Sequence, residues 1–391
     1  MKSFATLAAL LLAGACSGVA PRPTAAPTIV STPSAPPSST PLALPSVAPY
    51  VEAPLPNDTA ARLQEVLDDY IALGGTPSIS AAVIVPGTGT WASAVGLAEV
   101  TAAEPATPET VYAMGSITKT YTAALIMLLA EAGELDLDDA AADHLGALAA
   151  SKANGATVRQ LLGHRSGIFN YTDDTQIFED RPWTVDEVLE LVGAPRFEPG
   201  ERFEYSNTNY LLLGLVAEAV SDRPLTDLLR EYLFEPLDLD RTLYGPGEIA
   251  PEPVAHGYTA GDVDVYDASG VLPNANLASA AVAAGAMSAS ARDIARWLFS
   301  LYSGRVLTDE SLAQMLDFRA SMDYGLGVGL VAFPRGRVVI GHDGGIPGFI
   351  SSGYFDRRSG VVVVVLTNGE SLDVFGIVNR LFIEATSAPQ G

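Results

Sequence analysis

The chain is poor in cysteine, histidine and lysine, and each shortage is informative. Its 391 residues include a single cysteine, Cys16, so no internal disulfide is possible. The four histidines show no metal-binding spacing such as His-Glu-x-x-His, so we expect no zinc site, no other metal and no organic cofactor. Only three lysines are present, which makes the position of each one worth examining.

Positive charge is scarce overall. Lysine and arginine together number 22 against 46 acidic residues, which gives a formal net charge of −24. No basic patch is expected at this balance, so nucleic acid is excluded as a partner. Hydrophobic residues make up 48% of the chain, which is ample for a buried core in one large domain or two intermingled ones.

Long apolar runs are also missing, except at the N-terminus. No later run reaches the roughly 18 residues of a membrane-spanning helix. Met1-Lys2 and the apolar residues 4–13 are typical of an export signal. Ala13-Gly14-Ala15-Cys16 resembles a bacterial lipobox, in which the cysteine is lipidated and becomes the new N-terminus. We predict an export signal with a lipobox over 1–16, and a protein anchored through Cys16 to the outer face of the bacterial membrane. An ordinary cleaved signal with an incidental cysteine is the alternative.

The segment that follows has the composition of a linker. Residues 17–56 consist largely of Pro, Ser, Thr and Ala, with almost no charge. Such a segment cannot bury a core, so we predict a semi-extended tether. Residues 57–391 then form the folded domain, and nearly all of the acidic residues belong to it.

Strand patterns lie near both ends of this domain, and helical patterns lie between them. We predict an α+β fold whose antiparallel sheet comes from about 57–132 and 288–391, flanked by helices, with a helical insertion over about 133–287. Asp58 is the expected N-cap of the first helix. Helices are expected at 58–73, 116–132, 210–220, 225–232, 290–302 and 372–385, and strands at 79–85, 91–96, 324–332, 337–341, 349–355 and 361–366.

One of the rare lysines stands beside a serine at the start of a strongly apolar helix. Lys119 follows Ser116 by three positions, in Gly115-Ser116-Ile117-Thr118-Lys119. Residues i and i+3 of a helix lie on one face, so the hydroxyl and the amine are within reach of each other. An activated serine nucleophile needs this arrangement. Alone, Ser-x-x-Lys is also typical of an N-cap serine followed by a surface lysine.

Two further motifs favour the catalytic interpretation. Tyr205-Ser206-Asn207 precedes a helix, and His342-Asp343-Gly344-Gly345 follows a short strand at 338–340. In this order the three motifs resemble those of the penicillin-recognising serine hydrolases, meaning class C β-lactamases, D-alanyl-D-alanine carboxypeptidases and related esterases. The resemblance implies a β-lactamase/transpeptidase-like fold. The sequence contains no Gly-x-Ser-x-Gly motif, which argues against an α/β-hydrolase. It covers about 58–385 and extends to Leu161–Ile168, Tyr324–Gly327 and Gly341–Phe349.

The resemblance implies a role for each motif residue. Ser116 is the nucleophile that forms an acyl-enzyme. Lys119 and Tyr205 are both candidates for the general base, and the sequence leaves the choice between them open. Asn207 would donate hydrogen bonds to the substrate and to Lys119. The backbone N–H groups of Ser116 and Gly345 would form the oxyanion hole.

The third motif departs from the Lys-Thr-Gly that is commonest in the family. Its predicted substrate-binding residues are His342, Gly344 and Gly345, the glycines because they let a substrate approach the strand edge closely. His342 is expected to titrate near its ordinary pKa of about 6.5 and to attract a substrate carboxylate when protonated. Asp343 replaces a hydroxyl residue and would oppose such binding, which leaves room for a neutral ester or an amine-bearing substrate.

These observations predict a serine hydrolase that acts through an acyl-enzyme, most simply in the manner of a D-alanyl-D-alanine carboxypeptidase. An esterase or a β-lactamase of the same fold is the alternative, and a non-catalytic lipid-anchored binding protein is the alternative from another class. The expected partner is a small molecule or peptide with an amide or ester carbonyl, such as a peptidoglycan stem peptide, an ester or a β-lactam. His164, in its Leu-Leu-x-His-x-Ser-Gly context, is expected to be structural.

Overall fold

The computed structural model describes residues 47–179, 181–245, 247–259, 263–264, 275–321 and 323–387. The predicted export signal, Cys16 and most of the predicted tether lie outside these residues. Within the described part of the chain, no helix is long and apolar enough to cross a membrane.

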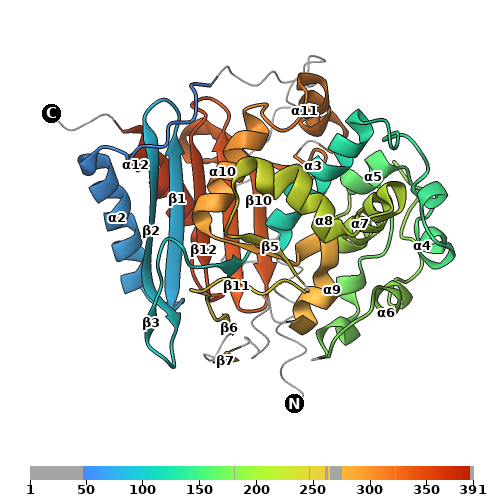
Figure 1. The fold of residues 1–391 in the computed structure, drawn as a ribbon, viewed down its shortest axis with the longest axis horizontal. Coiled ribbons are helices and arrows are strands. Elements are labelled where there is room, and N and C mark those ends of the chain that lie inside the picture. Colours follow the sequence, from blue (N-terminus) through green and yellow to red (C-terminus); the bar gives the residue numbers. More distant parts are fainter. Residues whose placement is uncertain are drawn as a thin grey trace, which may run out of the picture.

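A seven-stranded antiparallel sheet forms the centre of the fold, in the order β3-β2-β1-β12-β11-β10-β9 (Figure 1). Three of its strands come from the N-terminal part of the domain and four from the C-terminal part, and the predicted fold class is confirmed. The strands are β1 (Ser78–Val85), β2 (Gly89–Glu99), β3 (Glu104–Pro105), β9 (Gly329–Phe333), β10 (Arg337–Ile346), β11 (Phe349–Asp356) and β12 (Val362–Thr367).

The two ends of the chain meet where β1 pairs with β12, with Ile79 opposite Thr367. Strand β12 is buried along its whole length and consists mainly of valine, as expected for a central strand covered on both faces. Just beyond it, the buried side chain of Asn368 fastens this joint. Its Oδ1 accepts the backbone N–H of Ser78 at 2.7 Å, and its Nδ2 donates to the carbonyl of Leu97 at 3.1 Å.

One face of the sheet is covered by α2 (Asn57–Ala72) and α12 (Val374–Thr386), which lie side by side in Figure 1. Because side chains alternate along a strand, Val363 and Val365 of β12 point to this face. They join a fully apolar cluster. Its members include Leu63, Val66 and Leu67 of α2 and Ile377, Val378 and Leu381 of α12.

The opposite face is covered by α10 (Ala291–Tyr302), and α3 (Thr118–Glu131) packs against α10 in the same hydrophobic core, with Tyr121 stacked on Trp297. Eleven of the fourteen residues of α3 are buried, so this helix lies in the interior of the molecule. Ser290 caps α10 by accepting the N–H of Asp293, as its place before the first helical residue favours. Helix α11 (Asp309–Met315) follows α10.

Between α3 and α10 the chain is mostly helical and packs against α3 (Figure 1). Two small additional sheets have the strand orders β4-β8-β5 and β6-β7. The helices are α4 (Ala147–Lys152), α5 (Val158–Leu162), α6 (Val185–Glu190), α7 (Asn207–Ser221), α8 (Leu225–Leu229) and α9 (Ala275–Gly285), and the short strands are β4 (Tyr112–Ala113), β5 (Thr242–Tyr244), β6 (Tyr258–Thr259), β7 (Val263–Asp264) and β8 (Met287–Ala289).

Two local predictions are wrong. Asp58 is not the N-cap of α2. Pro56 precedes the helix without a side-chain cap, and Asp58 lies in the first turn, where it pairs with Arg62 at 3.2 Å. The third motif does not follow a short strand, because β10 continues to Ile346 and includes all four motif residues. The strand is longer than its apolar pattern indicates because the glycines and the polar residues pair with β11.

Candidate active site

Ser116 lies in a short 3₁₀ turn, η1 (Gly115–Ile117), which leads directly into α3. Its Oγ accepts two hydrogen bonds. One comes from Nζ of Lys119 at 3.0 Å, and the other comes from the hydroxyl of Tyr205 at 3.0 Å. The structure therefore brings together the three residues that the motifs single out for catalysis, although Tyr205 stands 89 positions along the chain from Ser116.

Lys119 is fully buried, which is rare for a lysine. Besides Ser116, its Nζ contacts the carbonyl oxygen of Ala284 at 2.6 Å and lies 5.0 Å from the ring centre of Tyr205. That carbonyl is available because Ala284 lies in the last turn of α9, where carbonyl groups have no partner within the helix. Burial lowers the pKa of Lys119 well below its ordinary value, and no carboxylate pairs with it among the described residues. A neutral lysine amine can accept a proton from a serine.

Gly115 brings the serine turn against the edge of β10. It has φ +49°, a conformation that favours glycine, and a Cβ at this position would lie 2.8 Å from the backbone nitrogen of Gly345. The backbones of the turn and the strand can approach closely only because this side chain is absent. The arrangement places Gly345 beside Ser116 in one pocket, which is the juxtaposition that an oxyanion hole needs.

The two motif glycines differ in what surrounds them. A Cβ on Gly344 would lie 2.0 Å from the carbonyl oxygen of Met114, so this glycine is required by packing inside the protein. A Cβ on Gly345 would meet nothing within 4 Å. The expectation that both glycines make room for a substrate therefore has to be corrected for Gly344. Only Gly345 lines the pocket.

Asn207 begins α7 and also lines the pocket. Its Nδ2 donates to Oγ1 of Thr172 at 3.2 Å, and its backbone N–H donates to Oδ1 of Asn170 at 2.9 Å. The predicted hydrogen bond to Lys119 is wrong for this structure, because the amine of Lys119 bonds to the carbonyl of Ala284 instead. Thr172 was not recognised from the sequence, since no motif contains it.

His342 is buried on β10, and both of its ring nitrogens are occupied. Nδ1 lies 2.5 Å from the carbonyl oxygen of Asp343, so it carries the hydrogen, and Nε2 then accepts the hydroxyl of Tyr324 at 3.0 Å. Burial, together with the nearby Lys119, lowers the pKa of His342 to about 3. The expected titration near 6.5 is therefore wrong, because the sequence does not reveal how deeply this imidazole is buried.

Asp343 points to the other face of the sheet from His342, as strand alternation requires. Its Oδ1 accepts the hydroxyl of Ser352, its pairing partner on β11, at 2.5 Å. The side chain keeps exposed surface at the end of β10, beyond the last residue that pairs with β9, while burial by its surroundings raises the pKa of the carboxyl and the hydrogen bond from Ser352 partly offsets this. The strand position that carries this negative charge is therefore adjacent to Gly344 and two residues before Gly345.

His164 lies beneath Tyr205 as a buried support. Its Nδ1 accepts the backbone N–H of Ser206 at 3.2 Å and lies 3.1 Å from Nδ2 of Asn209. Its ring is 4.2 Å from that of Tyr205, measured between centres. Burial, with Lys119 close by, lowers the pKa of His164 well below its ordinary value. It makes no hydrogen bond to Ser116 and instead fixes the turn that carries Tyr205.

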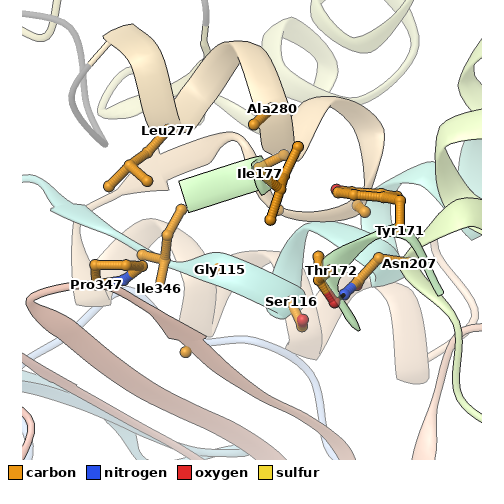
Figure 2. A pocket seen from close by; sticks show the side chains of 14 residues that line it. Gly115, Ser116, Tyr171, Thr172, Ile177, Asn207, Leu277, Ala280, Ile346 and Pro347 are labelled. Carbon is orange, nitrogen blue, oxygen red and sulfur yellow. Dashed lines mark hydrogen bonds between the residues drawn. The ribbon is translucent and has the colours of Figure 1, made fainter. Parts of the chain in front are cut away.

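The pocket above Ser116 is mainly apolar (Figure 2). Figure 2 shows Leu277, Ile177 and Ile346 on one side of it, with Asn207 and Thr172 beside the serine. The remaining lining residues are Gly115, Tyr171, Ala280, Ala281, Ala284, Gly285, Gly345 and Pro347. No group of three or more potential metal ligands occurs among the described residues.

A serine held by a buried lysine and a tyrosine, at the start of a helix that packs on an antiparallel sheet, defines a serine hydrolase of the penicillin-recognising type. The beta-lactamase family model matches residues 63–387. The chain belongs to that family, and the predicted family and enzyme class are confirmed. The alternative of a non-catalytic binding protein is set aside with this assignment.

Two proteins of similar sequence and one solved structure are representative of the proteins that this chain resembles. The chain is 33% identical to penicillin-binding protein 4 of Amycolatopsis lactamdurans over 67% of its own length and 73% of the relative. It is 28% identical to penicillin-binding protein 4* of Bacillus subtilis, and it spans 64% of the length of that protein. The solved D-amino acid amidase of Ochrobactrum anthropi SV3 superposes with a TM-score of 0.72 at 30% identity, over 84% of this chain and 98% of the amidase.

Proposed function

We propose that this serine hydrolase cleaves the amide bond that follows a D-configured residue in a short substrate, through an acyl-enzyme on Ser116. The observation that carries the proposal is the pair of 3.0 Å contacts from Lys119 and Tyr205 to the serine oxygen. The names of the relatives, penicillin-binding proteins and a D-amino acid amidase, support the choice of substrate class.

In the proposed mechanism Lys119 is the base. Its neutral amine takes the proton of the Ser116 hydroxyl, and Oγ attacks the carbonyl carbon of the substrate. The N–H groups of Ser116 and Gly345 hold the oxyanion, a contribution whose loss typically costs about 10²–10³ in rate. Tyr205 passes a proton to the departing nitrogen. Water then hydrolyses the ester, with the proton transfers repeated in reverse.

Lys119 is favoured over Tyr205 as the base for a physical reason. A lysine without an anionic partner in a buried site loses its proton readily, because the charged form is poorly solvated. Tyr205 has its hydroxyl directed at the serine oxygen and its ring against Lys119, a position from which it can relay a proton to the leaving group.

Two substrates fall within this proposal. The D-alanyl-D-alanine carboxypeptidase reaction predicted from the sequence removes a residue that ends in a carboxylate, whereas an amidase reaction releases a neutral leaving group. Esters and β-lactams present the same kind of carbonyl and are expected to acylate Ser116 as well.

Labelling with a fluorescent penicillin or a fluorophosphonate, followed by peptide mass spectrometry, tests the proposal. The expected adduct is on the peptide that contains Ser116. Release of D-alanine or D-alaninamide from N-acetylated dipeptides should be lost together with the adduct when the serine is replaced. An intact protein that hydrolyses these substrates without acylation of Ser116 would overturn the mechanism.

We also propose that the protein is exported and anchored by a lipid on Cys16, with residues 17–56 as the tether. The proposal rests on the lipobox-like Ala13-Gly14-Ala15-Cys16. Wild-type protein expressed in a bacterial host should then partition with membranes, and Cys16→Ser should release it or stall its processing. Equal partitioning of the two forms would show that this cysteine is not the anchor.

A further inference from the structure

We propose that the leaving-group side of this site selects neutral amides and esters over substrates that end in a free carboxylate. This inference rests on the proposed acyl-enzyme function and refines it. It depends on three features of the structure. The histidine of the third motif is committed to internal hydrogen bonds, the pocket has no cation, and an aspartate stands at the end of β10.

His342 offers no hydrogen to a substrate. Its Nδ1–H is directed at the carbonyl of Asp343, and its Nε2 accepts the hydroxyl of Tyr324. The ring is buried, and Tyr205, Tyr324 and His164 belong to the same aromatic group around Lys119. His342 is therefore a positioning residue for Tyr324. The lowered pKa that burial and Lys119 give it agrees with a neutral ring at working pH.

The pocket also lacks any other cation that could bind a substrate carboxylate in place of a protonated His342. None of its described lining residues is a lysine or an arginine. Lys119 stands behind the serine and is satisfied by Ser116 and Ala284. A carboxylate that enters such a site loses solvation and gains no ion pair, which disfavours its binding.

An arginine that contacts the pocket-lining loop is already paired. Arg196 bonds to Asp173, the residue after pocket-lining Thr172, and also to Glu204 at 2.7 Å. It is thus held between two carboxylates on an exposed surface. Such an arginine does not supply the free positive charge that a substrate carboxylate would need.

Asp343 adds charge of the wrong sign. Its exposed carboxylate is carried by the strand residue next to Gly344, and the Cα atoms of Asp343 and pocket-lining Gly345 are at most about 7 Å apart along the strand. Two negative charges at such a separation repel each other noticeably at the edge of a protein. A neutral carboxamide or ester at the same place does not incur this repulsion.

A matched pair of substrates tests the inference. N-acetyl-D-alanyl-D-alanine and N-acetyl-D-alanyl-D-alaninamide share the same scissile bond and acyl group and differ only in the terminal carboxylate. We expect kcat/KM for the amide to exceed that for the acid by about tenfold or more at pH 7, since a like charge is removed. A wild-type preference for the acid would overturn the inference.

Two variants locate the origin of the selectivity. Asp343→Asn removes the negative charge with little change in shape and should reduce the preference for the amide about two- to fivefold. His342→Lys introduces a cation and should reduce it further, whereas His342→Gln, which stays neutral, should leave the ratio near that of the wild type. A ratio that does not respond to Asp343→Asn and His342→Lys, in variants with wild-type circular dichroism, would contradict the electrostatic origin.

The pH dependence of the wild type provides a test that needs no variant. If His342 were a titrating anion-binding group, the acid would gain relative to the amide as pH falls from 8 to 6. We expect a constant ratio over this window. Titration of Lys119, Tyr205, Tyr324 or His164 would affect both substrates alike and cancels in the ratio. If neither dipeptide is hydrolysed while Ser116 still labels with a fluorophosphonate, the proposed substrate class fails. The selectivity is then measured with two p-nitrophenyl esters that share one acyl group and differ only in a carboxylate on the leaving group. Equal rates for that ester pair would also overturn the inference.

Discussion

The two faces of the central sheet are built on different principles. The face under α2 and α12 is closed mainly by apolar side chains, with Leu63, Val363 and Leu381 fully buried. The face under α3 buries Lys119, His164 and His342 as well. Burying such groups is unfavourable unless they are hydrogen-bonded, and Nε2 of His164 has no partner among the described residues.

This contrast separates stability from catalysis in space. The apolar face supplies hydrophobic burial without chemical function. The face under α3 buries polar groups at an energetic cost, and this burial lowers the pKa of Lys119 and keeps its amine neutral beside Ser116. Changes to the apolar residues of the first face should therefore alter folding alone, and changes in the polar group on the second should alter activity while leaving folding nearly untouched.

The largest expected effect is that of Ser116→Ala. Loss of the nucleophile should reduce kcat/KM by about 10⁴-fold or more and abolish covalent labelling. The melting temperature should change by little, because the serine is only half-buried. Ser151→Ala, at an exposed serine of α4, is the matched control and should behave like the wild type. Retained hydrolysis in Ser116→Ala would break the assignment of this face to catalysis.

Lys119→Met should lower kcat/KM by about 10²–10⁴-fold, the usual value of a general base. Stability should hold or increase, because an apolar side chain of similar length replaces a buried amine. Lys152→Met is the control, since that lysine donates to the carbonyl of Val192 on the periphery. A melting temperature that falls sharply in Lys119→Met but not in Lys152→Met would mean that the lysine is structural.

The same lysine sets two pH dependences with defined signs. Wild-type kcat/KM should fall as pH decreases through the lowered pKa of Lys119, because only the neutral amine accepts the serine proton. In the unfolded chain this lysine binds its proton more tightly, so between the folded and unfolded pKa values the stability of the wild type relative to Lys119→Met should rise with pH. Urea titrations of both proteins at several pH values measure this, and a difference that falls with pH would contradict the depressed pKa.

Leu381→Ala and Leu125→Ala sharpen the comparison of the two faces. Both leucines are fully buried, one on α12 and one on α3. Each substitution should cost about 2–5 kcal/mol in the free energy of unfolding. The folded fraction of Leu381→Ala should keep wild-type kcat/KM, whereas Leu125→Ala should also lose activity, because α3 carries Ser116 and Lys119. Equal activity losses in the two variants would show that the faces are not independent.

The smallest expected effect concerns the motif glycines. Gly344→Ala should cost about 1–3 kcal/mol of stability, since its Cβ would overlap the carbonyl of Met114. Gly345→Ala should fold like the wild type, because its Cβ meets no other atom, and should weaken substrate binding instead. Thermal melts and KM measured on both variants distinguish these outcomes. A reversal of the two would mean that Gly344 and not Gly345 faces the substrate.

The sequence was sufficient for the features that depend on local pattern. The buried helix after Ser116, the valine-rich strand that becomes β12 and the pairing of sheet segments from both chain ends follow from periodicity and element order. The proximity of Ser116, Lys119 and Tyr205 needed more than periodicity, because Tyr205 is distant in sequence. It was accessible only through the resemblance of three motifs to a known family.

The features that were missed depend on contacts between distant segments. His342 looks like a titrating histidine until Tyr324 and Lys119 are placed around it. Nothing in the sequence distinguishes Gly344 from Gly345. In the fold, the carbonyl of Met114 and the hydroxyl of Ser351 leave no room for a side chain at Gly344. Asn207 could have reached Lys119, but the last turn of α9 provides a partner for the amine in the carbonyl of Ala284. Desolvation and packing of this kind leave no trace in local composition.

The joint between the chain ends has a consequence for biosynthesis. Ser78 and Asn368, whose hydrogen bond fastens β1 beside β12, are 290 positions apart. A ribosome therefore has to synthesise the chain through β12 before the central strand pair can form. In chains interrupted before β12, β1 pairs only with β2 and its other edge stays open, so they should remain targets for proteases. We expect the protein to acquire its structure only after synthesis is essentially finished, as a single late event rather than segment by segment during elongation.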